Sequence, residues 1–140
     1  MKLTIDKASI IVDQALAHAR ANKIRPLCVA VLDDGGNVKA LKRDDGASLL
    51  RPTIAVSKAW GAIGMGESSR HLGNRLKDMT AFLGALSDMS GGKVVPVAGG
   101  VLLMDGDAII GAAGASGASA DEDEASVVAG IKAAGLEYKI

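Results

Sequence analysis

Arg43, Asp45 and Lys58 are charged residues whose types and order could form a binding site for a small acid. Arg43 is expected to end a β-strand, Asp45 to lie in the following loop, and Lys58 to lie on the next helix. A guanidinium and an ammonium group that meet at one end of the domain would bind a carboxylate. Asp45 would then orient Lys58 or act as a general base. An Arg43–Asp45 pair that only fixes the loop explains the same residues, so both interpretations stay open.

A second group of ligand-binding candidates precedes the last predicted helix. The run Gly114–Gly117 offers backbone N–H groups at a helix start, which is a common anion-binding arrangement. Residues 121–124 are all acidic, however, and already complement the helix dipole. Nucleotide binding is therefore disfavoured. Ser116 stays a candidate ligand-binding residue, and Asp123 is a candidate either for the ligand or as a structural partner of Lys58 or Arg43.

The chain contains two histidines, His18 and His71. His18 lies on the first predicted helix, between the apolar positions Ala15 and Ala19. His71 lies in a region where no element is firmly predicted, and its near-neutral pKa would suit proton transfer. A surface or boundary position on the helix for His18, and a solvated loop for His71, are the favoured explanations. The two lack the spacing of a histidine pair on one helix, so a dedicated zinc site is not expected.

Composition narrows the class of protein. The chain has 140 residues, 49% of them apolar and only 2% aromatic, and its sixteen basic residues balance sixteen acidic ones. A nucleic-acid-binding protein would carry a basic patch and stacking aromatic residues, so no nucleic-acid partner is expected. A net charge near zero favours self-association. We therefore expect a homo-oligomer whose other partner is a small molecule.

The single cysteine and the length of the apolar runs indicate in which cellular compartment the protein is expected. Cys28 alone excludes an intramolecular disulfide and a multi-cysteine zinc site. Its place in the apolar run Leu27–Leu32 predicts a buried, unreactive thiol. No stretch reaches the roughly 18 apolar residues of a membrane span, and residues 1–14 do not resemble a signal peptide. We expect a cytoplasmic protein with no membrane partner.

Hydrophobic periodicity and turn residues predict the elements that position these side chains. Helices are expected over residues 4–22, 52–63 and 120–136, and one or two short helices, interrupted at Gly73 and Gly84, between 64 and 88. Strands are expected over residues 27–32, 38–43, 94–97, 101–104 and 108–115. Tight turns at residues 33–37 and 105–107 make the sheet at least largely antiparallel.

This order of elements indicates one α+β domain over residues 1–140. A central antiparallel sheet of about five strands would be flanked by helices on its faces. The strands do not alternate regularly with helices, which argues against a doubly wound nucleotide-binding fold.

Several short motifs, taken in order, resemble the GlcG/HbpS-like haem-binding family. The motifs that carry the resemblance are Val31–Gly36, Arg43–Ala47, Lys58–Ala62, Pro96–Gly100, Ile109–Gly117 and Asp123–Glu124. They span nearly the whole chain, although Trp60-Gly61 stands where members often have Thr-Ala, and residues 64–92 match nothing in the family pattern. The resemblance implies a profilin-like fold and, as in many members, a homo-oligomer. The family also includes the C-terminal domain of some corrinoid adenosyltransferases.

The resemblance also suggests a ligand. Some members bind haem through a histidine of the first helix, which makes His18 the matching candidate for an axial ligand. Histidine is the commonest proximal haem ligand. The low aromatic content argues against a porphyrin site, because only Trp60, Phe82 and Tyr138 could line one.

Two functions therefore stay open. The first is a small-ligand-binding accessory protein that takes haem or a related tetrapyrrole and otherwise needs no cofactor. The second is a cofactor-independent hydrolase or isomerase that acts on a small organic acid through Arg43, Asp45 and Lys58. The sequence does not decide whether the protein is an enzyme.

Overall fold

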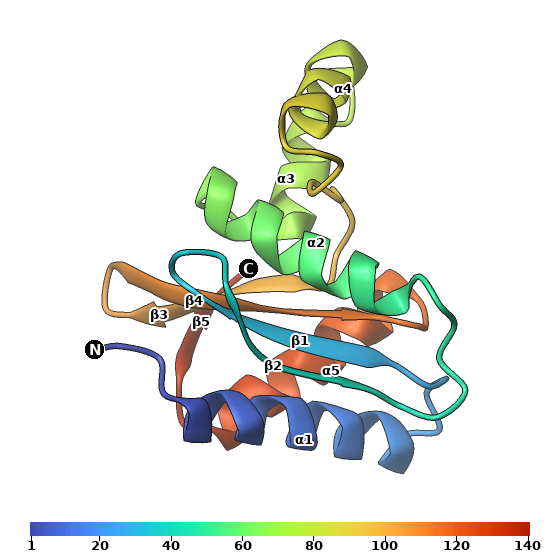
Figure 1. Cartoon of the computed structure of the whole chain (residues 1–140), viewed down its shortest axis with the longest axis vertical. Helices are drawn as coiled ribbons and strands as arrows, with labels where there is room; N and C mark the ends of the chain where they lie inside the picture. The colour runs from blue at the N-terminus through green and yellow to red at the C-terminus, as the bar shows by residue number, and fades with distance from the viewer.

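A computed structural model describes residues 1–140 and places one five-stranded sheet between helices (Figure 1). The elements in chain order are α1 (Ile5–Ala21), β1 (Cys28–Asp33), β2 (Val38–Arg43), α2 (Arg51–Met65), α3 (Ser69–Leu76), α4 (Thr80–Met89), β3 (Gly100–Asp105), β4 (Ala108–Ser116), α5 (Ala120–Ala133) and β5 (Glu137–Lys139). The strand order is β2-β1-β4-β3-β5, and every neighbouring pair is antiparallel. The predicted α+β fold with a central antiparallel sheet of five strands is confirmed.

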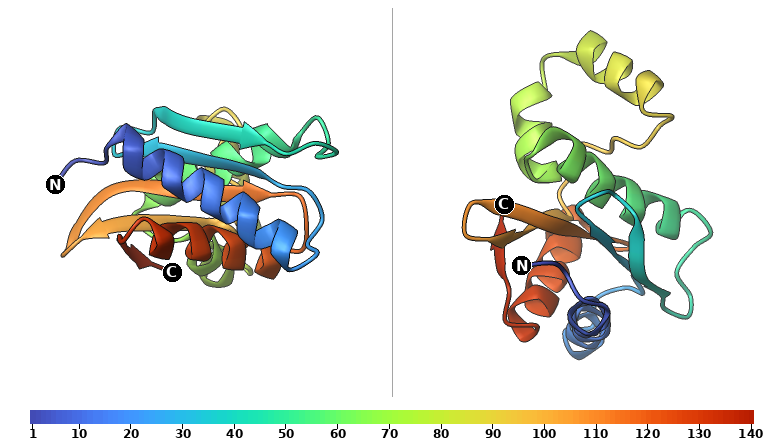
Figure 2. Two further views of the ribbon diagram at one scale, coloured as in Figure 1. Left: turned by 90° about the horizontal axis from the view of Figure 1, so that it is seen from below. Right: turned by 60° about the vertical axis from the view of Figure 1, so that its left-hand side comes forward.

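The sheet is covered on both faces, as Figure 2 shows. Helices α1 and α5 lie side by side on one face, and α2 lies on the other. The interior strand β1 is apolar from Cys28 to Leu32, where both of its faces are buried. Its Val29 and Val31 pack in the core beneath α1 and α5, whereas Ala30 and Leu32 pack with residues of α2. None of the helices is long and apolar enough to cross a membrane.

The fifth strand is not the one that the sequence predicts. Residues 94–97 form a loop rather than a strand, and Pro96, which lacks an N–H group, cannot donate to a strand ladder. The edge strand is β5, which pairs with β3. The last helix was expected to continue to Leu136, but it ends at Ala133 because Gly135 adopts a positive φ of 70°.

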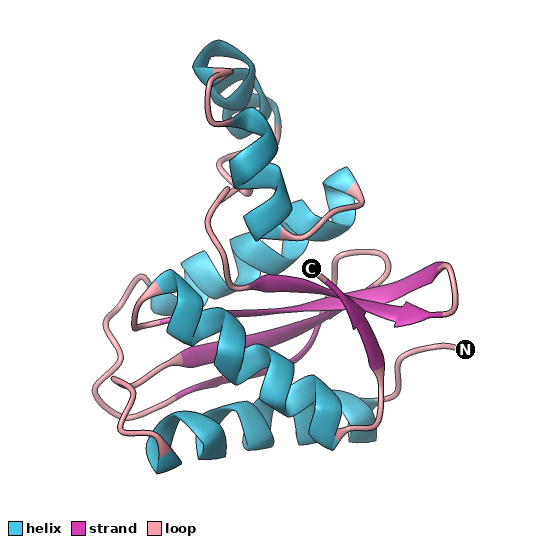
Figure 3. Cartoon of the chain, turned by 180° about the vertical axis from the view of Figure 1, so that it is seen from behind, coloured by secondary structure: helices cyan, strands magenta, loops and turns pink.

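The α3–α4 hairpin, residues 69–89, projects away from the sheet and is called here the α3–α4 arm (Figure 3). Gly73 and Gly84 were expected to interrupt the helices, but each lies inside one, and the break falls between Leu76 and Thr80. A side chain at Gly73 would overlap the carbonyl oxygen of Pro96, so glycine lets α3 approach the loop before β3. Leu86 is the only buried residue of α4.

Cys28 lies at the start of β1 and is fully buried. Burial raises the pKa of its thiol to about 11, so at pH 8 the reactive thiolate is scarce. We expect the folded protein to resist labelling by a thiol reagent such as dithionitrobenzoate at pH 8, and the urea-unfolded protein to react at once with one thiol per chain. Fast labelling of the folded protein would contradict this placement.

Candidate functional site

Three neighbouring strands bring a row of side chains to one end of the sheet. Arg43 of β2, Cys28 of β1 and Ser116 of β4 lie directly opposite one another. Residues opposite each other on antiparallel strands point to the same face. Cys28 packs against Ala55 of α2, so Arg43 and Ser116 also face the side of the sheet that α2 covers.

A buried ion pair joins the two helix layers around this end of the sheet. The Lys58 Nζ atom of α2 lies 3.1 Å from Asp123 Oδ2 of α5, and the two side chains are only 4% and 2% exposed. Lys58 Nζ also donates to the carbonyl oxygen of Ala115 at 3.0 Å, and Asp123 Oδ1 accepts from the Ala118 N–H at 3.0 Å. Of the two structural partners considered for Asp123, Lys58 and Arg43, the structure has Lys58. Burial raises the pKa of Asp123, against the opposing effects of the Ala118 N–H and the Lys58 charge.

Lys58, Ser116 and Asp123 line one cavity of about 180 Å³. Three of the five predicted ligand-binding residues therefore come together. The cavity has a fourth polar residue, Arg51, whose Nη1 donates to Ser116 Oγ at 3.2 Å. Sequence reasoning missed Arg51, although its spacing of seven residues from Lys58 places both on one face of α2 and could have indicated it.

The structure does not bring Arg43 and Asp45 to Lys58. Arg43 Nη1 donates to the carbonyl oxygen of Ala47 at 2.7 Å, inside its own loop. Asp45 is exposed, and its side chain forms no ion pair or hydrogen bond. The alternative Arg43–Asp45 pair is absent as well: the aspartate of this loop that forms an ion pair is Asp44, which accepts two hydrogen bonds from Arg20. The prediction that Arg43, Asp45 and Lys58 meet in one site is therefore wrong.

The acidic residues that open α5 have separate roles. Asp121 and Glu124 both accept hydrogen bonds from Arg70 of α3. Glu122 forms part of a capping box at the start of the helix, which leaves Asp123 alone to turn inward. These contacts explain the run of four acids by helix capping and ion pairing.

The two histidines lie in different surroundings. His18 is half-buried on α1, two turns after Ile11, whose carbonyl oxygen abuts Gly130 of α5. This spacing places His18 on the side of α1 that faces α5. His71 is exposed, and its Nδ1 lies 2.6 Å from Glu67 Oε2. Arg75 also hydrogen-bonds to Glu67 and is the main cause of the lowered pKa of that carboxyl.

His71 and Glu67 border the largest of the main cavities, of about 400 Å³. The lining is mostly polar and includes Lys139 near the chain end. A second cavity, of about 230 Å³, is apolar and lies between α2 and the α3–α4 arm, beside Trp60 and Leu86. Drug-sized ligands usually occupy cavities of roughly 300–1,000 Å³, so one copy of the chain offers no large apolar cleft.

Comparison with known proteins gives both a family match and curated relatives. The family model "Haem degrading protein HbpS-like" matches residues 3–132. The corrinoid adenosyltransferase PduO of Citrobacter freundii is 31% identical over 108 residues, which cover 76% of this chain and 32% of that protein. PduO of Salmonella typhimurium is 32% identical over the same lengths. The matched region thus spans about a third of these curated relatives.

Solved structures agree over the whole fold. The structure described as a PduOC:heme complex has a TM-score of 0.90 and 26% identity, with 100% of both chains covered. A double mutant of HbpS from Streptomyces reticuli has a TM-score of 0.82 and 29% identity, with 94% of this chain and 86% of that chain covered.

Proposed function

The chain belongs to the HbpS-like family of haem degrading proteins, and from that premise we propose that it binds haem or a related tetrapyrrole as an accessory protein. One observation carries the proposal: a structure described as a haem complex aligns with this chain over 100% of both chains. At 26% identity the likeness extends beyond a shared fold alone. The cytoplasmic location expected from the sequence stays a prediction.

Haem binding is favoured over the other functions considered for this chain. The PduO relatives are corrinoid adenosyltransferases, but the matched region spans only about a third of them, so that activity is not carried over. Neither the family match nor the similar structures support a cofactor-independent hydrolase or isomerase, and Arg43 and Asp45 do not contact Lys58.

Co-elution with two tetrapyrroles tests the ligand class. The full chain is mixed with haemin or with aquacobalamin and passed through a gel-filtration column. We expect haemin to co-elute with the protein at a fixed ratio and aquacobalamin to separate from it. Retention of aquacobalamin but not haemin would overturn the haem proposal in favour of a corrinoid, and retention of neither would overturn both.

His18 is our proposed axial ligand. Neutral imidazole binds haem iron readily, and His18 is half-buried on the α5-facing side of α1. We expect His18→Ala to weaken haemin binding by about tenfold or more, as loss of a strong ligand interaction would, and to shift the Soret band. His71→Ala is the matched control and should leave both unchanged. An effect confined to His71→Ala would reassign the ligand.

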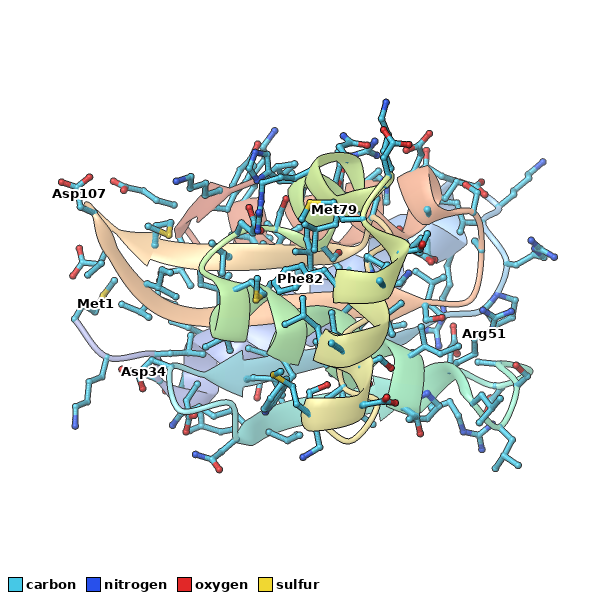
Figure 4. The ribbon with its side chains drawn as sticks, turned by 90° about the horizontal axis from the view of Figure 1, so that it is seen from above. Met1, Asp34, Arg51, Met79, Phe82 and Asp107 are labelled. Atoms are coloured by element: carbon cyan, nitrogen blue, oxygen red, sulfur yellow. The ribbon has the colours of Figure 1, made fainter.

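A haem on the surface of α1 needs a cover that one chain does not supply, so we propose that the protein works as a homo-oligomer. The exposed apolar side chains of the α3–α4 arm, on which Figure 4 labels Met79 and Phe82, support self-association. Its Met79, Phe82 and Met89 are 48%, 42% and 75% exposed. A ten-residue helix is too short to be stable without packing, and an exposed apolar patch commonly marks an interface.

Light scattering tests this assembly. We expect the wild-type chain to have the mass of an oligomer and Phe82→Asp to lower that mass, because a charge would be buried in an apolar contact. Leu49→Asp changes an exposed apolar residue outside the arm and should keep the wild-type mass. A monomeric wild type, or an unchanged mass in Phe82→Asp, would contradict the proposal.

A further inference from the structure

Three of the six arginines lack a carboxylate partner, and these three lie together. Arg20, Arg70 and Arg75 each form an ion pair with Asp or Glu. Arg25, Arg43 and Arg51 form none, and they gather where β1 begins and β4 ends. Arg25 and Arg51 line the same cavity of about 190 Å³, and Arg43 donates to Ala47, which is part of its wall. In a chain of zero net charge this local excess of cations needs an explanation.

Arg51 connects this cavity with the one beside the buried ion pair. It lines both cavities, of about 190 and 180 Å³, at the end of the molecule opposite Met1 and Asp107 (Figure 4). Its Nε donates to Ser48 Oγ and its Nη1 to Ser116 Oγ, each at 3.2 Å. These two contacts hold the guanidinium in place between the cavities. The two cavities therefore adjoin at the Arg51 side chain, which both of them share.

The buried polar atoms around Arg51 retain unused hydrogen-bond donors. A guanidinium has five N–H groups and an ammonium has three. Arg51 uses two of its five, and Lys58 uses two of its three, on Ala115 and Asp123. Ser116, which is 1% exposed, accepts from Arg51 and has its hydroxyl proton free to donate. Donors of this kind, fixed in a buried wall, are complementary to an oxyanion.

We infer that the two cavities form one binding site for a small dicarboxylate, with one carboxylate at Arg51, Ser116 and Lys58 and the other at Arg25. The inference does not depend on the proposed haem function. Besides Asp123, whose charge is paired with Lys58, the remaining lining of the inner cavity is apolar, through Ile54 and neighbouring valines and alanines. That lining suits a short carbon skeleton, which inorganic phosphate lacks.

Calorimetric titration of the full chain with succinate tests the site, with inorganic phosphate and the neutral analogue succinamide as comparison ligands. We expect saturable binding of succinate and none of succinamide. Arg51→Met should weaken succinate binding by about tenfold or more, because a charge-assisted hydrogen-bonding group is lost. Arg51→Lys should restore part of it, because the charge stays and the fork is lost.

Two further variants keep the test decisive. Arg25→Met alters an exposed residue with no partner, so it should fold normally and still weaken succinate binding. Arg75→Met removes a distant arginine and should leave binding unchanged. Absence of saturable succinate binding, or equal binding by the wild type, Arg25→Met and Arg51→Met, would overturn the site. Phosphate binding stronger than succinate binding would overturn the dicarboxylate assignment.

Haem propionates are also carboxylates, so a second experiment distinguishes a haem propionate from a free dicarboxylate as the ligand. The titration is repeated with haemin-loaded protein. Unchanged succinate binding supports a free dicarboxylate as the ligand. Loss of succinate binding, together with weaker haemin binding by Arg51→Met, would assign the site to a propionate and overturn the free ligand.

Discussion

Replacing Lys58 with methionine is expected to lower the free energy of unfolding by about 3–5 kcal/mol, the usual cost of removing one partner from a buried ion pair. Methionine keeps much of the length of the lysine side chain but leaves Asp123, which is 2% exposed, without its cationic partner. Urea unfolding followed by circular dichroism measures the change. Lys42→Met is the matched control: its pair with Asp13 is 62% and 50% exposed, so the cost should be about 1 kcal/mol or less.

The pH dependence of the Lys58→Met variant follows from the same pair. Burial already raises the pKa of Asp123 in the wild type, and loss of Lys58 raises it further. The folded variant then binds a proton more readily than the unfolded chain, whose aspartate has a pKa of about 3.9. Its stability should therefore fall as pH rises from about 4 towards the folded pKa. The deficit relative to wild type should be smallest in acid.

A double variant separates the lost charge from lost packing. Asp123→Asn keeps an acceptor for the Ala118 N–H and removes the unpaired charge. Combined with Lys58→Met, it should recover a large part of the stability. A Lys58→Met cost no larger than that of Lys42→Met would contradict a buried, charged pair at this position.

Gly130→Ala should have the second large effect on stability. A β-carbon at Gly130 would overlap the main-chain carbonyl oxygen of Ile11, at the close approach of α5 to α1. The two helices would have to separate, which typically costs about 1–3 kcal/mol. Gly64→Ala is the matched helical control, because its β-carbon would meet only the Trp60 ring, at an ordinary 3.8 Å.

The two glycine variants are expected to differ in sign. Gly64→Ala should raise the free energy of unfolding by about 0.5–1 kcal/mol through improved helix propensity, and Gly130→Ala should lower it. Urea unfolding of both variants measures the difference. A stabilised Gly130→Ala would mean that α1 and α5 are not in backbone contact.

Most of the fold could be predicted because its signals are local. The apolar run of β1, the turn after it and the periodicity of α1 each depend on neighbouring residues. The strand β5 was missed because its three residues come directly after a segment with helical periodicity. Only the positive φ of Gly135 ends that helix. The course of the α3–α4 arm was missed because the role of Gly73 depends on Pro96, which is far away in the sequence.

The candidate site was predicted only in part, because some of its residues are marked by local motifs and others are brought together only by the tertiary fold. Lys58, Ser116 and Asp123 were identified, and they line one cavity. Arg51 and Arg25 were not, because no motif marks them and only the tertiary fold makes them neighbours. Asp45 lies in the predicted loop but does not reach Lys58, because the lysine turns inward to Asp123 and the loop stays exposed.

Titration of the wild-type apo protein with haemin, followed at the Soret band, tests the central claim most directly. The account predicts a saturable change with an end point at a fixed ratio of haemin to chain. A change that grows steadily without an end point, as loose uptake by apolar surface would give, would contradict the proposal that this protein binds haem at a defined site.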